Sequence, residues 1–338
     1  MSALPDDAGA AGLWTLAWRR LRADRVAMVA LAVVAAFLLM LVLSAAGLVA
    51  ADWEEEVGVN YAPPTFVGAA PAAIAAAAAP ALPVPDNPFD PLAAEIGLLR
   101  AQLGAEQAAP RRATLPFGAD KWGHDVIKKT IKGGETSIVV GLVAATVAVS
   151  LGTLFGAVSG FYGGVVDDLC NWFYNVFTSI PSILMILTVA AVLQHKGVTT
   201  IVLILGLTGW TGPYRLIRAE YLRHKAREYV LAADAIGASN LRKMFAHIFP
   251  NVSHVALVQL SILAVGFIKA EVILSFLGFG VPVGVVSWGS MLNEAQNELL
   301  LGKWWQLSAA AVAMAVLVTA FSLLADALRD ALDPKVKA

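Results

Sequence analysis

Ionisable and nucleophilic side chains in this sequence show no arrangement typical of a catalytic or metal-binding site. The one cysteine, Cys170, excludes both an intramolecular disulfide and a thiol-based metal site. The neighbouring carboxylates Asp167 and Asp168 could do acid–base work, but in a short turn we interpret them as solvated helix-cap residues. The histidines are scattered along the chain and comprise His124, His195, His224, His247 and His254. We therefore predict no catalytic residue, no bound metal and no cofactor.

Composition indicates a membrane protein without its own nucleotide chemistry. The 338 residues are 58% hydrophobic and 14% charged, whereas ordinary soluble domains hold roughly 25% charged residues. Mean hydropathy is +0.71. The phosphate-binding pattern G-x-x-x-x-G-K-[ST] is absent from the sequence, so we expect no ATP hydrolysis by this chain. The net charge of −1 gives no indication of a nucleic-acid partner.

Six apolar stretches are long enough for membrane-spanning helices, which need about 20 mainly apolar residues. The first, residues 26–51, contains no charge and follows four arginines. Because a cleaved signal has an apolar core of only about 7–15 residues, we interpret this stretch as an uncleaved helix. The other spans are expected at about 136–160, 175–193, 199–217, 254–277 and 304–324. The sequence therefore predicts an all-α fold, a polytopic bundle of six transmembrane helices.

Two details within these spans bear on how they are positioned. Gly152, Gly156 and Gly160 recur every fourth residue, a spacing that either allows another helix to approach closely or is filler among small residues. Trp304 and Trp305, at the start of the sixth span, fit an aromatic belt at the outer face of the membrane.

The placement of lysine and arginine predicts orientation, because short cytoplasmic segments carry an excess of these residues. They concentrate in the amino tail 1–25, the connection 218–251 and the carboxyl tail 328–338. With six spans these three regions fall on one side, so we expect both termini in the cytoplasm. Residues 52–135 would lie outside as one long segment, and 136–327 would form a five-helix core that includes the cytoplasmic connection.

The expected outer segment contains an insert rich in alanine and proline. Its run 68–84 is interrupted by three prolines, which favours an external linker over a seventh span. Residues 91–104, "PLAAEIGLLRAQLG", have the pattern of a short amphipathic helix. We assign no chemistry to this insert.

A mixed polar and apolar stretch, "EYVLAADAIGASNLRKMFAHIFPN" at residues 228–251, separates the fourth and fifth predicted spans. Tyr229, Ala233 and Ile236 recur on one face of a first short helix. Gly237 can take the left-handed conformation that ends a helix, since it has no Cβ to clash. The pattern predicts a tight turn at this glycine.

A second short helix is expected after the turn, with Ser239 as its N-cap and Pro250 as its end. Its apolar stripe consists of Leu241, Met244, Phe245 and Ile248. A hairpin of this size cannot bury its own stripe. It must pack on its own spans, on the bilayer surface or on another protein.

The hairpin resembles the cytoplasmic coupling loop of ABC-importer permeases, whose pattern is Glu-Ala-Ala, three residues, Gly, nine residues, Ile, any residue, Leu-Pro. The matching residues are Ala232, Ala233, Gly237 and Pro250, while Leu231, His247 and Phe249 depart from the pattern. Glu228 lies three residues before the usual glutamate position. The opening "EYV" and the closing "PN" look like the peptide-permease branch.

Other segments carry the same resemblance in the same order along the chain. They are "LAWRRLRADRVAMVAL", "FGADKWGHDV" with His124 where arginine is usual, "GFYGGVVDDL", "SIPSILMIL", "LSFLGFG", "SWGSML" and "DALRDALDP". Together they cover most of residues 14–334 outside the insert 54–113. The chain is similar to the dipeptide, oligopeptide and nickel permease family of ABC importers, in its second-subunit branch.

This resemblance implies the type I importer permease fold in a bacterial inner membrane. It implies as partners a second homologous permease, two cytoplasmic ATPase subunits and an extracytoplasmic solute-binding protein. The ATPase-coupling site would comprise Glu228, Tyr229, Ala232, Ala233, Gly237, Ser239, His247 and Pro250. Arg242 and Lys243 would either meet acidic groups of the ATPase or anchor the positive side. Lys269 and Glu271 are candidates for lining the path or for paired structural charges, and Glu271 matches a family position.

Two other function classes stay open from the residues alone. An ion-coupled secondary carrier would show internal repeats and broken helices, and the Gly206–Pro213 cluster is the nearest feature to a broken helix. The other class is a membrane scaffold that transports nothing. Within the resembled family, short peptides are the expected cargo, with nickel or another small solute as the alternative.

Overall fold

The computed structural model describes residues 13–69, 92, 95–98, 111–193, 197–282 and 284–332. Helices dominate these residues, and the only β pairing among them consists of isolated bridges, which agrees with the predicted all-α class. The chain divides into two compact units. The helical unit comprises Met1–Val49, Thr130–Glu294 and Ala310–Ala338, and the small unit comprises Ala50–Lys129 and Ala295–Ala309.

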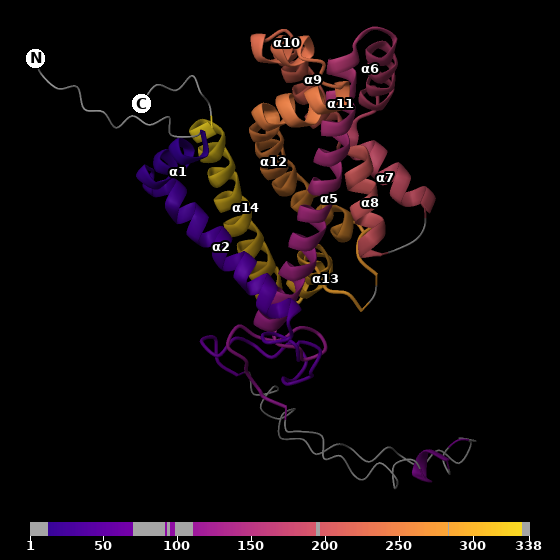
Figure 1. Ribbon diagram of the computed structural model, residues 1–338. Coiled ribbons are helices and arrows are strands. Elements are labelled where there is room, and N and C mark those ends of the chain that lie inside the picture. Colours follow the sequence, from indigo (N-terminus) through magenta and orange to yellow (C-terminus); the bar gives the residue numbers. More distant parts are fainter. Residues whose placement is uncertain are drawn as a thin grey trace, which may run out of the picture. The chain divides into compact units, whose positions relative to one another are not determined.

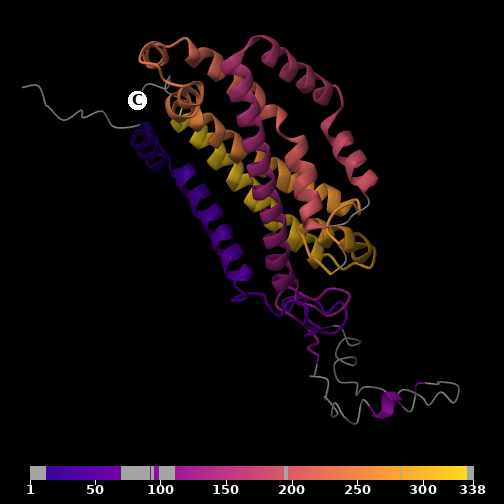
Figure 2. The same cartoon turned by 45° about the vertical axis from the view of Figure 1, so that its right-hand side comes forward.

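The helices are drawn and labelled in Figure 1 and seen from a second direction in Figure 2. They are α1 (Leu13–Ala23), α2 (Arg25–Ala45), α5 (Val126–Tyr162), α6 (Gly164–Thr178), α7 (Ser182–Leu193), α8 (Val198–Thr208), α9 (Thr211–Lys225), α10 (Glu228–Ala235), α11 (Asn240–Arg242), the π-helix η1 (Lys243–Ile248), α12 (Phe249–Phe276), α13 (Trp288–Leu300) and α14 (Trp305–Leu332).

Four helices among the described residues are long and apolar enough to cross a membrane. They are α2, α5, the continuous helix Asn240–Phe276 and α14. Helices α6 and α7 pass the same test only as a pair, bent by 82°. The structure therefore supports four or five spans, and the predicted count of six is not confirmed.

The third and fourth predicted spans are both broken. Helix α6 ends at Thr178 and α7 begins only after Pro181, whose ring and missing N–H cannot continue a helix. The stretch predicted as the fourth span is divided between α8 and α9, with the break at Gly209 and Trp210. The apolar run alone predicts one helix there, although its second half is amphipathic and polar.

The first span is shorter than predicted, because α2 ends at Ala45 rather than near residue 51. Gly47 has a φ of 70°, and its N–H donates to the carbonyl of Ser44. The N–H of Leu48 donates to the carbonyl of Leu43 at 2.9 Å. These two bonds satisfy the last carbonyls of the helix and stop it at the glycine.

Other helices extend beyond their predicted bounds. Helix α5 begins at Val126, ten residues early, because the Asp125 carboxylate caps it by accepting from the N–H groups of Ile127 (2.7 Å) and Lys128 (3.3 Å). Helix α14 continues to Leu332, into the segment expected as carboxyl tail. Helices α1 and α13 were not predicted.

The spaced glycines of α5 are a contact surface for α9, which confirms the close-approach interpretation. A Cβ at Gly152 would lie 2.5 Å from the carbonyl oxygen of Trp210, and one at Gly156 would lie 2.8 Å from that of Tyr214. Gly160 approaches Arg218 in the same way. The backbones are therefore too close for any side chain at these three positions.

In the small unit, Trp305 is buried and its Nε1 donates to the carbonyl of Ala119 at 2.6 Å. The prediction of a belt residue was therefore wrong for Trp305. Trp304 is exposed and contacts the rings of Phe66 and Phe117. The Ala/Pro-rich run lies outside the described residues, as does most of the predicted helix 91–104, of which residues 95–98 are helical.

Candidate coupling site

The predicted turn of the hairpin 228–251 is present. Helix α10 ends at Ala235, and Gly237 has a φ of 80°. The N–H of Gly237 donates to the carbonyl of Asp234 and that of Ala238 to the carbonyl of Ala233. Only a residue that tolerates positive φ can close this end of the helix at low cost.

The second helix begins as predicted but does not stop where predicted. The Oγ of Ser239 accepts a hydrogen bond from the N–H of Arg242 at 3.4 Å, as an N-cap does. Pro250, expected to end the helix, lies in the first turn of α12, and the helix continues from Asn240 to Phe276. The π-helical turn η1 ends shortly before the proline. Its wider hydrogen bonding, with Phe249 N–H donating to the Met244 carbonyl, accommodates a residue without an N–H.

One side of the hairpin is fastened to the rest of the helical unit. Val230, Met244 and Ile248 are buried against apolar residues of α5 and α9. The Tyr221 hydroxyl donates to the carbonyl of Met244 at 3.1 Å, and burial raises the pKa of Tyr221 to about 12. The phenol therefore stays protonated as a donor. Lys243 is buried and binds Asp234, so it is not available to an ATPase as proposed from the sequence.

The other side carries exposed apolar side chains. Its most exposed member, Ile236, keeps 85% of its surface accessible. We call this set the hairpin surface, and it consists of Tyr229, Leu231, Ile236, Leu241 and Phe245. The predicted stripe of the second helix is thus split, with Met244 and Ile248 inside and Leu241 and Phe245 outside.

The remaining predicted coupling residues differ in their exposure. Glu228, Ala232, Ser239 and Pro250 are exposed, whereas Ala233 is buried and His247 is half-buried. The imidazole of His224 lies 2.8 Å from the Tyr229 hydroxyl, which joins α9 to α10. The structure therefore brings most of the predicted coupling residues together on one hairpin.

Lys269 and Glu271 have different environments. Lys269 is exposed, so it alone of the pair lies on a surface that another helix or a solute could reach. Glu271 is fully buried and accepts hydrogen bonds from the hydroxyls of Ser137 and Ser275, both at 2.6 Å. The structure gives no support to Glu271 as a path-lining residue.

An interaction that sequence reasoning missed joins α6 to α9. Both oxygens of Asp167 accept from the Arg218 guanidinium at 2.6 Å. Ser159 of α5 and Asn171 also donate to this carboxylate. Asp167 is therefore a hydrogen-bonded anchor rather than a solvated cap, and its neighbour Asp168 is exposed. Because Asp167 and Arg218 are 51 residues apart, no local pattern connects them.

The chain matches two protein families. Residues 152–338 match the binding-protein-dependent transport system inner membrane component family. Residues 12–64 match the N-terminal TM domain of oligopeptide transport permease C.

Several transport permeases are similar to this chain over most of their own length. The dipeptide transport system permease protein DppC of Bacillus subtilis is 36% identical over 69% of this chain and 72% of its own. The oligopeptide transport system permease protein OppC of the same organism is 36% identical over 65% and 72%. OppC of Haemophilus influenzae is 33% identical over 65% and 70%. The chain therefore belongs to the family of binding-protein-dependent transport system inner membrane components, and it is a membrane-spanning permease subunit of a transport system.

Proposed function

We propose that this chain forms half of the translocation path of an ATP-driven importer of short peptides. A second homologous permease would supply the other half, two cytoplasmic ATPase subunits the energy, and an extracytoplasmic binding protein the cargo. Dipeptide and oligopeptide transport in the names of the relatives supports peptides over nickel. Family membership also favours this function over an ion-coupled carrier or a scaffold.

The observation that carries the proposal is the hairpin surface. A folded hairpin gains nothing by leaving five large apolar side chains exposed beside a well-packed core, and such exposed patches mark binding sites. A groove on the ATPase would cover these side chains. Glu228, Ser239 and the turn at Gly237 would form the polar rim and the bend of the docked hairpin.

The continuous helix supports a mechanical role for docking. From Asn240 to Phe276 it has 37 residues, which corresponds to about 55 Å at 1.5 Å per residue. A displacement of the hairpin would therefore be transmitted along this continuous helix to α12. Tyr221 of α9 and the buried residues of the hairpin keep the start of the helix packed on α9. The exposed Lys269, near the other end of this helix, would then lie at the path or at the partner permease.

The arrangement of the helical unit supports cytoplasmic termini. Both views place α1, α10 and the carboxyl end of α14 at the same end of this unit (Figures 1 and 2). The Nη1 of Arg20 lies 3.5 Å from the carbonyl of Ala331, which joins the two terminal helices. Since α1 and the hairpin both carry arginines, the positive-inside rule puts this end in the cytoplasm.

Cysteine crosslinking tests the docking directly. After Cys170→Ser removes the native thiol, Ile236→Cys would be crosslinked in membranes that contain the whole transporter. Val165→Cys on α6 is the matched control, because Val165 is 84% exposed and Ile236 is 85% exposed. We expect Ile236→Cys to capture an ATPase subunit in an ATP-sensitive manner and Val165→Cys to capture less. Capture of lipid or of this chain alone at Ile236 would refute the docking.

A further inference from the structure

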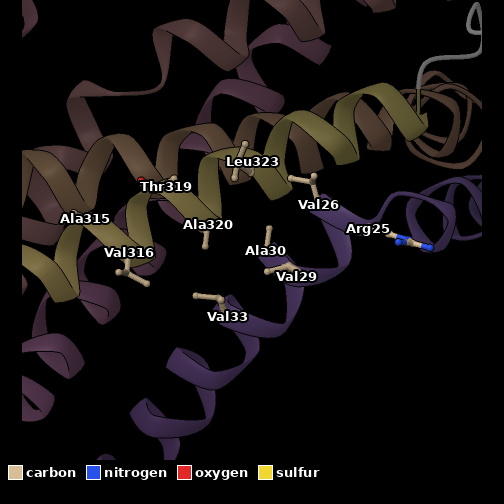
Figure 3. A pocket seen from close by; sticks show the side chains of 10 residues that line it. All are labelled: Arg25, Val26, Val29, Ala30, Val33, Ala315, Val316, Thr319, Ala320 and Leu323. Carbon is tan, nitrogen blue, oxygen red and sulfur yellow. The ribbon is translucent and has the colours of Figure 1, made fainter.

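A groove runs between α2 and α14 in the helical unit, away from the hairpin surface. It has a volume of about 600 Å³. Figure 3 labels the ten lining residues, which come from both helices, and shows the Arg25 guanidinium at one end, extending outward from the apolar side chains. Ala30 and Ala320 are buried and form its floor, while Val29 and Val316 are exposed at its rims. The groove exists because its floor residues are small.

The lining of this groove is apolar along its length and cationic at one end. Among the described residues that line it, Arg25 is the only charged one and Thr319 is the only other polar one. Arg25 is exposed, and among the residues that the structure describes no ion pair or hydrogen bond to its guanidinium is found. The groove therefore fits a molecule with a long apolar part and a single anionic end.

The surroundings of Arg25 reinforce the positive charge at that end. Residues 19–25 contain four arginines and one aspartate. The Asp24 carboxylate is used locally, since its Oδ1 accepts from the N–H groups of Val26 (2.8 Å) and Ala27 (3.3 Å). Arg22 is exposed and stacks on Trp18 at 5.6 Å, which is an arrangement suited to the lipid headgroup level.

From these observations we propose that the groove between α2 and α14 binds an anionic phospholipid, with one acyl chain between the helices and the phosphate at Arg25. Basic sites at the cytoplasmic ends of transmembrane helices are a recurrent way of binding anionic headgroups. Charge complementarity at a single end distinguishes this occupant from a helix of another subunit, which would bring an apolar surface along the whole groove and leave Arg25 without an anion.

The test uses the assembled transporter, purified from membranes and stripped of loosely held lipid. Native mass spectrometry would then count the lipid retained when phosphatidylglycerol or phosphatidylcholine is added back. We expect the wild type to prefer phosphatidylglycerol, and Arg25→Gln to lower its affinity about fivefold. Arg19→Gln is the matched control, because Arg19 is also exposed, lies on the adjacent α1 and does not line the groove.

A second pair of variants tests the apolar part. Ala315→Phe places a ring in the groove from an exposed position and should reduce retention of both lipids. Ala36→Phe, also exposed but outside the groove, should not reduce it.

Three outcomes would overturn the site. Equal losses of phosphatidylglycerol from Arg25→Gln and Arg19→Gln would mean diffuse electrostatic attraction to the basic segment. Absence of headgroup preference would overturn it too, as would a crosslink from Val29→Cys to the second permease without retained lipid.

Discussion

The Oγ of Ser137 on α5 donates a hydrogen bond of 2.6 Å to the carboxylate of Glu271 on α12, across 134 residues of sequence. The same Oγ accepts from the backbone N–H of Trp288, at the start of α13, at 3.2 Å. Glu271 and Ser137 are both fully buried. One serine hydroxyl therefore joins three helices, and one of them is the long helix that begins in the hairpin 228–251.

Ser137→Ala should destabilise the protein more than its small change in volume implies. It leaves the buried N–H of Trp288 without this partner and removes one donor from Glu271, and a buried polar group without its partner costs about 1–3 kcal/mol. Thermal unfolding of the purified protein in detergent would measure the loss. Ser261→Ala, on the same helix as Glu271, is the control, since the one described partner of the Ser261 hydroxyl is the Leu257 carbonyl one turn before it. Equal midpoints for the two variants would contradict the role of Ser137.

The packing of α5 on α9 makes a second prediction. Gly156→Ala should weaken folding and reduce the amount of protein in the membrane, because its Cβ would lie 2.8 Å from the carbonyl oxygen of Tyr214 and 3.0 Å from the amide nitrogen of Arg218. Backbone atoms cannot move aside as a flexible side chain can. Gly266→Ala is the matched control within a helix, since a Cβ at Gly266 would have no neighbouring atom within 4 Å. Expression and unfolding measurements should separate the two, and similar behaviour would show that the helices can shift apart.

These two relationships mark what the sequence could and could not predict. The glycine spacing of α5 was visible because it is local and periodic. Likewise Gly237 and Ser239 were identified because turn and cap chemistry depends on a few neighbouring residues. The Ser137–Glu271 and Asp167–Arg218 pairs were not predicted, because each joins helices that only the tertiary fold brings together.

The errors in the helix bounds have a related physical cause. A window of apolar residues measures hydrophobicity but is insensitive to a bend, so the break at Pro181 was missed. The break at Gly209 was counted within one span, although the Gly206–Pro213 cluster around it had been recognised as the feature most like a broken helix. At Pro250 the error was the reverse, because the sequence predicted a helix end where the helix continues. A proline is tolerated in the first turn of a helix, and the π-helical turn before it allows the helix to pass through.

The small unit should lose stability in acid through Asp120. Burial alone would raise the pKa of this carboxyl, but the charge of Lys129 and its hydrogen bond, with help from His124, hold the pKa below its ordinary value. Asp120 therefore stabilises the folded unit above its ordinary pKa of about 3.9, and this contribution is lost as the pH falls through the lower folded value. Stability should be unchanged near neutrality and should decline only below about pH 4.

Amide hydrogen exchange can measure this effect, because the N–H groups of Trp122 and His124 both donate to the Asp120 carboxylate. Asp120→Asn should reduce their protection at neutral pH and remove the dependence on acid. The control Asp52→Asn changes an exposed carboxylate that pairs with Lys128, and exposed pairs contribute little. Unchanged protection in Asp120→Asn would show that the buried bonds do not depend on the charge.

Gly237 offers the sharpest test of coupling, because its environment separates backbone strain from crowding. Nothing lies within 4 Å of a Cβ built at this position, yet its φ is 80°. A β-branched residue resists that conformation, so Gly237→Val should deform the turn. We expect the ratio of uptake to ATP hydrolysis to fall at least about tenfold, which is the effect of about 1.4 kcal/mol of strain on an equilibrium. Gly237→Asn has a side chain of similar size that tolerates the left-handed region, so it should retain most of the coupling. Both rates would be measured in vesicles that contain the complete transporter. Normal uptake in Gly237→Val, or equal defects in both variants, would show that the left-handed turn is not what transmits the motion.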